Sequence, residues 1–337
     1  MKAMVLEKPA PVETAPLSYS DVPAPQPQPG QILARIEACG VCRTDLHIVE
    51  GELPIHRKPV IPGHEIVGRV EALGPNCSRF KAGDRVGVAW LHHSCGACEY
   101  CRRGQENLCD APLFTGYDTD GGYAEFTCAY EEFAYPLPAE LSASTVAPLL
   151  CAGIIGYRAL KRSEVKPGER LGLYGFGASA HIVIQIALHW GCEVYVSSRD
   201  KRHQNLAREM GAAWVGDSAE RPPRKLHGAI LFAPAGALVP PALEALDKGG
   251  TLAVAGIYLS EIPALDYDRH LFRERTLRSV TSNTREDGRE LLRLAAGIPL
   301  RAHTQSFALG EANEALRRLK HDEISGAAVL LISPGAS

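Results

Sequence analysis

Four cysteines in the stretch CGACEYCRRGQENLC have the spacing of metal ligands. They are Cys95, Cys98, Cys101 and Cys109. Gaps of two residues let neighbouring thiolates converge on one tetrahedral ion, and the two glycines of the stretch permit the tight turns that bring the last cysteine back. Four thiolates leave zinc no open position, so the ion would have a structural role. We predict a structural zinc here rather than a set of unrelated reduced thiols.

A second group of candidate ligands is scattered along the chain and mixes residue types. Cys42 lies in GVCRTDLH, His64 in GHEIVG and Cys151 in PLLCAG. Two thiolates and one imidazole form one of the ligand sets that leave the fourth position of zinc open to water or an oxygen-bearing substrate. Taken singly each residue is weak evidence, because lone cysteines and histidines are usually structural. Their spacing alone does not link them.

Length and composition limit the kind of protein this chain can be. Its 337 residues exceed the size at which one hydrophobic core stops growing, about 250 to 300 residues, so we expect two domains. The net charge of -3 gives no basic excess for binding nucleic acid or an anionic membrane. The N-terminus has no signal-peptide pattern, and no uncharged apolar run of about 20 residues follows, so we expect a soluble, cytoplasmic protein. Ten cysteines in such a chain favour metal binding or catalysis over disulfides.

Several motifs occur in the order seen in the zinc-containing medium-chain alcohol dehydrogenases. They are GVCRTDLH, GHE, GDRV at residues 83–86, the four-cysteine lobe, GGYAEF and APLLCAG. The sequence resembles that family, a branch of the medium-chain dehydrogenase/reductases, nearly from end to end. The resemblance implies two zinc ions per chain: a catalytic zinc held by Cys42, His64 and Cys151, and a structural zinc in the lobe.

The resemblance also implies an α/β fold of two domains. Residues 1–152 and 284–337 would form a mostly β, GroES-like catalytic domain that carries the structural zinc lobe. Residues 153–283 would form a doubly wound, Rossmann-type domain that binds NAD(P).

The stretch GVCRTDLH contains two further residues with an implied role in catalysis. In the family the hydroxyl at the position of Thr44 accepts the alcohol proton, and the histidine at the position of His47 passes it towards solvent through the cofactor ribose. Without the resemblance, turn capping and a solvated helix face would explain both residues equally well.

Three charged residues near the ligands have implied supporting roles. Metal-bound histidines usually donate their second N–H to a carboxylate or carbonyl, and in similar enzymes the aspartate at position Asp45 supports the histidine ligand. Glu65 occupies a position that lies close to the metal in the family. Arg43 carries a fixed charge on a planar fork of donors that suits a pyrophosphate, as the matching family position also suggests.

The remaining cysteines receive no role. Cys39 and Cys42 form a C-x-x-C pair, which in isolation would indicate a redox site. Cys39 ends the apolar alternation ILARIEAC, so we interpret it as a buried strand thiol. Cys77, Cys128 and Cys192 have no spacing that suggests ligation.

The segment ERLGLYGFGASAHIVIQIALHWGCEVYVSS predicts a strand, a glycine turn, a helix and a second strand. Gly175 and Gly177 would permit the tight turn and the close approach of a pyrophosphate to the helix N-terminus. Ala180 replaces the third glycine of the dinucleotide motif and still permits close packing of helix on strand. The segment therefore predicts the opening of a dinucleotide-binding domain.

The end of the second predicted strand, VYVSSRDKR, bears on cofactor choice. NAD-binding domains place Asp or Glu there to accept a hydrogen bond from the ribose 2′-OH, whereas our alignment places Ser198 at that position. Arg199, Lys201 and Arg202 follow and would attract a 2′-phosphate. We favour NADP, as in the similar cinnamyl-type members; the alternative is that Asp200 takes the acidic role and the cations form an ordinary surface.

Two other features bear on substrate and cofactor contacts. The family implies that Trp90 or Leu91 lies near the metal, and Leu53 stands where yeast-type enzymes have tryptophan, which suggests room for alcohols longer than ethanol. Ala327 follows the glycine of the last turn, where the family often has a basic residue, so Arg43 would carry more of the pyrophosphate binding.

The sequence thus predicts a zinc-dependent alcohol dehydrogenase that reversibly oxidises primary or secondary alcohols with NAD(P)+. We expect a small-molecule alcohol or aldehyde substrate, a homodimer or homotetramer, and neither nucleic acid nor membrane as a partner. A polyol dehydrogenase is an alternative, but that branch usually replaces the third cysteine ligand by Glu. A non-enzymatic protein that binds zinc and nucleotide is a second alternative, and it would require an inert inner site.

Overall fold

The chain divides into two compact units in the computed structural model, which describes residues 1–138, 141–218, 220–298, 300–324 and 326–333. The first unit comprises Met1–Cys151, Ser282–Gly297 and Arg301–Ser337. The second comprises Ala152–Thr281 and Ile298–Leu300. The division expected from the sequence differs from this one at Ala152, at residues 282–283 and at Ile298–Leu300.

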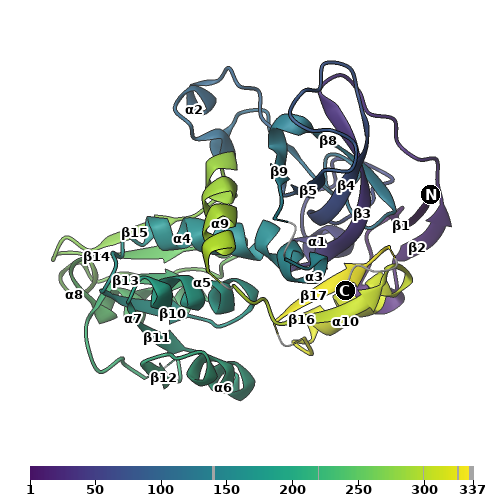
Figure 1. Cartoon of the computed structure of the whole chain (residues 1–337). Coiled ribbons are helices and arrows are strands. Elements are labelled where there is room, and N and C mark those ends of the chain that lie inside the picture. Colours follow the sequence, from purple (N-terminus) through teal and green to yellow (C-terminus); the bar gives the residue numbers. More distant parts are fainter. Residues whose placement is uncertain (139–140, 219, 299, 325, 334–337) are drawn as a thin grey trace. The chain divides into compact units, whose positions relative to one another are not determined.

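The first unit is built mainly of strands (Figure 1). Within the described residues its largest sheet has the order β16-β17-β3-β4-β5-β9, and β8 also pairs with β3. The bounds are β16 Thr304–Ala308, β17 Ala327–Leu331, β3 Gln31–Val41, β4 Glu65–Leu73, β5 Arg85–Val88, β9 Ala134–Pro136 and β8 Phe126–Tyr130. Only β16 and β17 pair in parallel; the other pairs are antiparallel. The last described strand of the chain, β17, therefore pairs with β3, which lies near the start of the chain.

Shorter elements surround this sheet. Two small antiparallel pairs are β1 Lys2–Leu6 with β2 Leu17–Asp21, and β6 Leu91–His93 with β7 Leu113–Phe114. The α-helices of the unit are α1 Arg43–Glu50, α2 Glu99–Arg102, α3 Ala143–Val146, α9 Arg285–Gly297 and α10 Ala312–Lys320. The 3-10 helices are η1 Val12–Thr14, η2 Glu106–Leu108, η3 Glu131–Phe133, η4 Ala147–Leu150 and η6 Leu309–Glu311.

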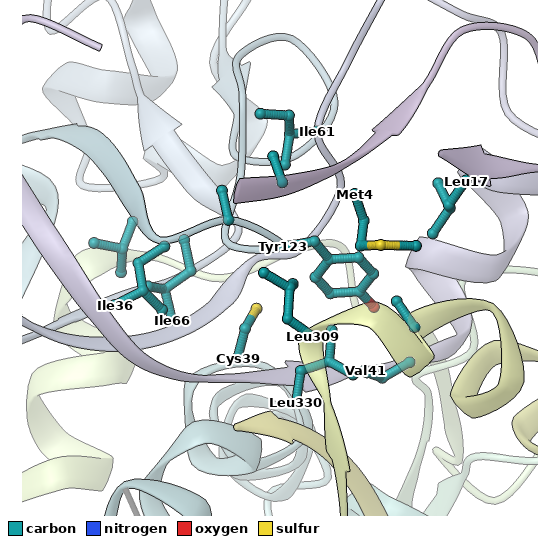
Figure 2. Packing of buried hydrophobic residues seen from close by; sticks show 14 of the residues in the cluster. Met4, Leu17, Ile36, Cys39, Val41, Ile61, Ile66, Tyr123, Leu309 and Leu330 are labelled. Atoms are coloured by element: carbon teal, nitrogen blue, oxygen red, sulfur yellow. The ribbon is translucent and has the colours of Figure 1, made fainter. Parts of the chain in front are cut away.

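The strand β3 shows why this sequence forms a half-buried sheet. Ile32, Ala34 and Ile36 alternate with more exposed residues, which is the period-two pattern of a strand with one buried face. Cys39 near its end is fully buried, as predicted. Figure 2 shows this thiol among the apolar side chains of the core, close to the ring of Tyr123. The thiol therefore packs as a small hydrophobe.

The second unit is a doubly wound domain, as predicted. Its described strands form one parallel sheet in the order β12-β11-β10-β13-β14-β15. This is the dinucleotide-binding order 3-2-1-4-5-6 when β10 is counted as the first strand. The strands are β10 Arg170–Tyr174, β11 Glu193–Ser197, β12 Trp214–Gly216, β13 Leu226–Leu231, β14 Leu246–Val254 and β15 Thr276–Ser279.

The helices described in the second unit lie before β10 and between successive strands, except between β12 and β13. They are α4 Ala152–Arg162, α5 Ala178–His189, α6 Lys201–Glu209, η5 Gly236–Leu238, α7 Val239–Ala245 and α8 Tyr267–His270. No single helix among the described residues of the chain is long and apolar enough to cross a membrane. One bent pair of helical segments, Ala143–Leu150 with Ala152–Arg162, is long and apolar enough to span a membrane by length and composition only.

The turn before β4 leaves no room for a side chain at Gly63. Its φ is +100°, and a Cβ atom there would lie 2.4 Å from Cδ1 of Tyr123. We expect Gly63→Ala to lower the free energy of unfolding by about 2 to 4 kcal/mol, because backbone strain and overpacking add. Urea unfolding of purified protein measures this.

Gly83→Ala is the matched control for this substitution. Gly83 also has a positive φ, +90°, but a Cβ there meets nothing within 4 Å. This control should carry only the backbone strain, a loss of about 1 kcal/mol. Equal losses in the two variants would contradict the steric argument.

Candidate functional site

Four potential metal ligands converge inside the first unit. The donor atoms of Cys42, His64, Glu65 and Cys151 all lie within 4.8 Å of one another. The Sγ atom of Cys42 lies 3.2 Å from Nε2 of His64. Ligand atoms bound to one tetrahedral zinc lie about 3.3 to 3.8 Å apart, given bond lengths of about 2.0 to 2.3 Å. The donor set and its spacing therefore fit a zinc ion.

The sheet register brings two of these ligands together. Cys42 follows the last residue of β3, and His64 precedes the first residue of β4. These strands are antiparallel, with Gly40 opposite Glu65, so the end of one meets the start of the other. The carboxylate of Glu65 occupies the space above Gly40, where a Cβ atom would lie 1.7 Å from Oε2.

A capping box holds the first ligand in place. Cys42 is the N-cap of α1, and its Sγ accepts a hydrogen bond from the backbone N–H of Thr44 at 3.3 Å. In return Asp45 accepts from the backbone N–H of Cys42 at 2.9 Å. This reciprocal arrangement satisfies free donors at the start of the helix. It also points the thiol away from the helix axis and towards His64.

The carboxylate of Asp45 also orients His64. Its Oδ1 lies 2.9 Å from Nδ1 of His64, and it accepts the backbone N–H of Gly63 at 3.2 Å. Both side chains are fully buried. Because Nδ1 carries the proton for this bond, Nε2 remains for a metal, which is the usual second contact of a histidine ligand.

The pKa values of the candidate ligands are shifted by their neighbours. The hydrogen bond from Cys151 lowers the pKa of the Cys42 thiol well below its usual range, against the effect of burial. Burial opposes the charged form of His64, but the charges of Asp45 and Cys42 outweigh it and raise the pKa of the imidazole. A divalent ion binding here therefore displaces protons as it binds.

Thr44 and His47 lie on the helix that begins at Cys42. They are three residues apart on α1, so they share one helix face. The Nδ1 atom of His47 is paired with the carboxylate of Glu52, just beyond the end of the helix. The imidazole side chain is one-fifth exposed, so it can exchange protons with solvent.

Both ends of α1 form ion pairs with residues at or just beyond the end of α10. Arg43, at the first turn, donates to Oδ1 of Asp322 at 2.5 Å. Glu50, at the last turn, accepts from Nζ of Lys320 at 2.8 Å. Neither Asp322 nor Lys320 was identified as a site residue from the sequence, and no local motif indicates either contact.

Aromatic side chains form one wall beside the inner site. Trp90 meets the ring of His64 edge-on, with ring centroids 5.0 Å apart, and stacks on Phe114 at 4.8 Å. Leu91 is buried in β6, and Leu53 packs against the core cluster of the unit. Trp90, one of the two residues expected near the metal, is therefore in contact with a candidate ligand.

The four cysteines of the lobe form a second converging group. Their sulfur atoms all lie within 4.8 Å of one another, and Sγ of Cys95 is 4.0 Å from Sγ of Cys101. Backbone N–H groups point at the sulfurs: that of Cys98 donates to Cys95 at 3.3 Å and that of Cys101 donates to Cys98 at 3.5 Å. The N–H of Ala97, with that of Cys98, lowers the pKa of the Cys95 thiol to about 6. The group fits a zinc ion with four thiolate ligands.

A half-buried ion pair anchors this lobe to α9. Glu106 in η2 accepts the backbone N–H of Arg285 at 2.6 Å and pairs with its guanidinium at 2.7 Å. That guanidinium also lies 4.4 Å from the ring centroid of Phe133. The lobe is therefore fixed to the first unit by more than its cysteines. The sequence offered no signal for this pairing.

The nucleotide motif has the predicted geometry within the second unit. Gly175 follows β10 with a φ of +89°, and a Cβ there would lie 2.9 Å from the backbone N of Ala233. Gly177 is the N-cap of α5, and a Cβ there would meet nothing, which leaves the helix N-terminus open. Ala180 is fully buried on α5. This arrangement suits a pyrophosphate at the helix N-terminus.

Some of the residues after β11 are held by structural contacts, and others are exposed and available to a ligand. Ser198 is buried directly after the strand, and its N–H donates to the carbonyl of Gly216. Asp200 caps α6 and pairs with Arg202 at 2.7 Å, which lowers the pKa of its carboxyl to about 2. Lys201 donates to Gln204. Arg199 is exposed, and no ion pair of it is found among the residues that the structure describes.

None of the ten cysteines forms a disulfide. Cys39 and Cys192 are buried, and Cys77 and Cys128 are half-buried. Burial raises the pKa of the Cys39 thiol well above its usual range, so it is a poor nucleophile. The C-x-x-C pair of Cys39 and Cys42 therefore has no redox geometry of its own.

Comparison with known proteins identifies relatives of the whole chain. Two family descriptions match: an alcohol dehydrogenase GroES-like domain at residues 28–139 and a zinc-binding dehydrogenase at residues 180–297. A curated relative, the probable alcohol dehydrogenase AdhA of Mycobacterium tuberculosis, is 55% identical over 98% of this chain and 97% of its own length.

Two solved structures add information on the nucleotide. CAD from Helicobacter pylori complexed with NADP(H) is 26% identical, covers 98% of this chain and 97% of its own, and has a TM-score of 0.87. Acetophenone reductase from Geotrichum candidum in complex with NAD is 26% identical, covers 98% and 96%, and has a TM-score of 0.86.

Replacing one ligand from each cluster should separate the two metal sites. We expect Cys98→Ser to remove one zinc ion and to lower the melting temperature by roughly 5 °C or more, because the ion holds the lobe together. Cys151→Ser should remove the other zinc and leave the melting temperature within about 3 °C of the parent, since strands and core build that region. Metal content by mass spectrometry and a thermal melt measure both effects.

Cys77→Ser controls for the loss of a thiol, because the hydroxyl can keep the hydrogen bond to the carbonyl of Gln31. This variant should retain both ions. A chain in which Cys151→Ser unfolds the lobe and Cys98→Ser leaves it intact would show that the two assignments are exchanged.

Proposed function

The chain belongs to the family of zinc-containing medium-chain alcohol dehydrogenases, and we propose that it reversibly oxidises primary or secondary alcohols to aldehydes or ketones with hydride transfer to NAD(P)+. The observation that carries the proposal is the inner ligand group. Two thiols and one imidazole converge there, and a buried carboxylate orients the imidazole. In the proposed set Cys42, His64 and Cys151 would be the three ligands, and the fourth position, near which the carboxylate of Glu65 also lies, would take the alcohol oxygen.

The proposed roles of the chain's residues follow from their positions. Bound zinc would supply Lewis acidity that makes an alcohol hydroxyl more acidic, and bound nicotinamide would accept the hydride. Cys42, His64 and Cys151 would hold the metal, with Glu65 beside them. Asp45 fixes the tautomer of His64 so that Nε2 faces the ion. Trp90 would limit the space available to the substrate's carbon chain.

The proton would leave through α1. The hydroxyl of Thr44 accepts the alcohol proton and passes its own proton towards His47, three residues further along the same helix face. His47 releases the proton to solvent, and Glu52 at its Nδ1 keeps the ring oriented during the exchange.

We propose NADP as the preferred cofactor. Ser198 stands at the strand end where an acidic residue would repel a 2′-phosphate. The alternative acid, Asp200, is occupied as the cap of α6 and as the partner of Arg202. Arg199 is exposed beside it and available to a phosphate. The Helicobacter pylori relative was solved with NADP(H) and the Geotrichum candidum relative with NAD, so the fold accepts either.

We also propose two zinc ions per chain and a cytoplasmic homodimer or homotetramer, as the family resemblance implies. Metal content and light scattering on purified protein test these points directly.

The primary test is absorbance at 340 nm with zinc-loaded protein. Alcohols from ethanol to benzyl and cinnamyl alcohol are offered with NAD+ or NADP+ in parallel. We expect turnover of the larger alcohols and a higher kcat/KM with NADP+. Two bound zinc ions without turnover of any alcohol would contradict the proposed activity.

Thr44→Val removes the hydroxyl and keeps the shape of the side chain. We expect kcat to fall by about 10² to 10⁴-fold, the usual contribution of a proton-transfer group, while the Kd for the nucleotide changes little. Thr44→Ser, which keeps the hydroxyl, should stay within about tenfold of the parent. A Thr44→Val enzyme with parental kcat would rule out the proton path.

Ser198→Asp places a carboxylate at the strand end. We expect kcat/KM with NADP+ to fall by about tenfold or more and that with NAD+ to rise, because the carboxylate repels a 2′-phosphate and accepts from a 2′-OH. Ser18→Asp, at an exposed position of β2, controls for the added charge.

Because Ser198 is buried, Arg199→Ala provides a second variant that adds no buried charge. It should weaken NADP+ selectively. Equal effects of Arg199→Ala on both cofactors would contradict the NADP assignment.

A further inference from the structure

The guanidinium of Arg43 is held by an acidic side chain. It donates from Nη2 to Oδ1 of Asp322 at 2.5 Å, and about half of the arginine side chain and two-thirds of the aspartate side chain are exposed to solvent. In the proposed function, Arg43 binds the pyrophosphate of the cofactor. A carboxylate and a phosphate compete for the same planar fork of donors, because both accept paired N–H bonds from it.

The other charges around Asp322 have partners of their own. His321 pairs with Glu13 at 3.3 Å, and Glu323 pairs with Arg317 at 3.3 Å. Lys320 is bound to Glu13 and to Glu50. Among the described residues, Arg43 is therefore the one ion-pair partner of Asp322. The neighbouring charges at the end of α10 are paired with one another and with Glu13 and Glu50.

The backbone fixes the position of the aspartate. Asp322 lies in the turn after α10 with a φ of +54°, in the left-handed region. The amide N–H of the same residue donates to the carbonyl of Leu319, so the turn is closed by the helix itself. Because Lys320 in the same segment also binds the last turn of α1, the carboxylate is presented to Arg43 by a fixed frame.

We propose that Asp322 sets the affinity for the dinucleotide by competing with its pyrophosphate for Arg43. The inference rests on the proposed contact between Arg43 and the pyrophosphate. In the free protein the carboxylate keeps the guanidinium in one position. When the nucleotide binds, the guanidinium must give up this partner or share it with an anion, and the carboxylate then repels the phosphates. Asp322 thereby weakens nucleotide binding and speeds its release.

Asp322→Asn is the variant that tests this most sharply. Asparagine tolerates the left-handed conformation as well as aspartate does and has the same shape, so only the charge changes. Glu323→Gln is the matched control, since it removes a charge of the same sign from the next residue, which is also exposed and whose partners are Arg317 and Arg318.

We expect Asp322→Asn to lower the Kd for NADP+ and for NAD+ by about two- to fivefold, the range of an exposed ion pair. Tryptophan fluorescence measures both constants. The Kd for adenosine 2′-monophosphate, which has no pyrophosphate, should not change. Glu323→Gln should leave all three constants at parental values. An unchanged Kd for the two dinucleotides, or an equal change for adenosine 2′-monophosphate, would overturn the proposal.

A double-mutant cycle with Arg43→Gln separates this proposal from the one on which it rests. Arg43→Gln should weaken both dinucleotides, and Asp322→Asn should then have no further effect. If Arg43→Gln leaves the Kd unchanged, the assigned pyrophosphate contact is wrong. Arg43→Gln could also weaken binding while Asp322→Asn tightens it equally in both backgrounds. In that case Asp322 repels the nucleotide through its long-range electrostatic field and not by holding Arg43.

Discussion

Three hydrogen bonds to one buried carboxylate hold the inner site together. Asp45 accepts from the backbone N–H of Cys42, the backbone N–H of Gly63 and Nδ1 of His64, and it is fully shielded from water. A buried charge without such partners would cost several kcal/mol, so the carboxylate imposes its geometry on all three donors. It thereby fixes the start of α1, the turn before β4 and the tautomer of a ligand. Glycine is required at the donor Gly63, because its φ is +100° and a Cβ there would lie 2.4 Å from Cδ1 of Tyr123.

The two candidate metal sites are built by opposite means. In the lobe the ligands are close in sequence, and backbone N–H groups of the same short loop surround the sulfurs. At the inner site the ligands come from the end of β3, the start of β4 and the residue after η4, and the antiparallel register of β3 and β4 brings the first two together. A metal is therefore expected to organise the lobe, whereas the inner site has its shape from the core.

This difference explains how much the sequence alone could predict. Local spacing was enough for the lobe and for the glycine turn after β10, since both are set by residues that are neighbours in the chain. Linking Cys42, His64 and Cys151 needed the family resemblance, because no periodicity connects positions brought together by sheet register. Sequence patterns predicted the opening strand, glycine turn, helix and second strand of the second unit, and the order of its six strands came only from the structure. The partners Glu52, Glu106 and Asp322 could not be predicted, because ordinary surface acids acquire such contacts only from the fold.

The charges proposed to meet the nucleotide act on two separable quantities. In the proposed function Ser198 and Arg199 would face the one group that distinguishes NADP from NAD, so they would change the difference between two binding free energies. Arg43 and Asp322 concern the pyrophosphate, which both cofactors carry, and any change there shifts both binding free energies equally and cancels from their difference. Selectivity and affinity can thus be adjusted independently. A dehydrogenase must release its nucleotide in every cycle, and where that release limits kcat a carboxylate that weakens the shared contact would raise kcat without loss of selectivity.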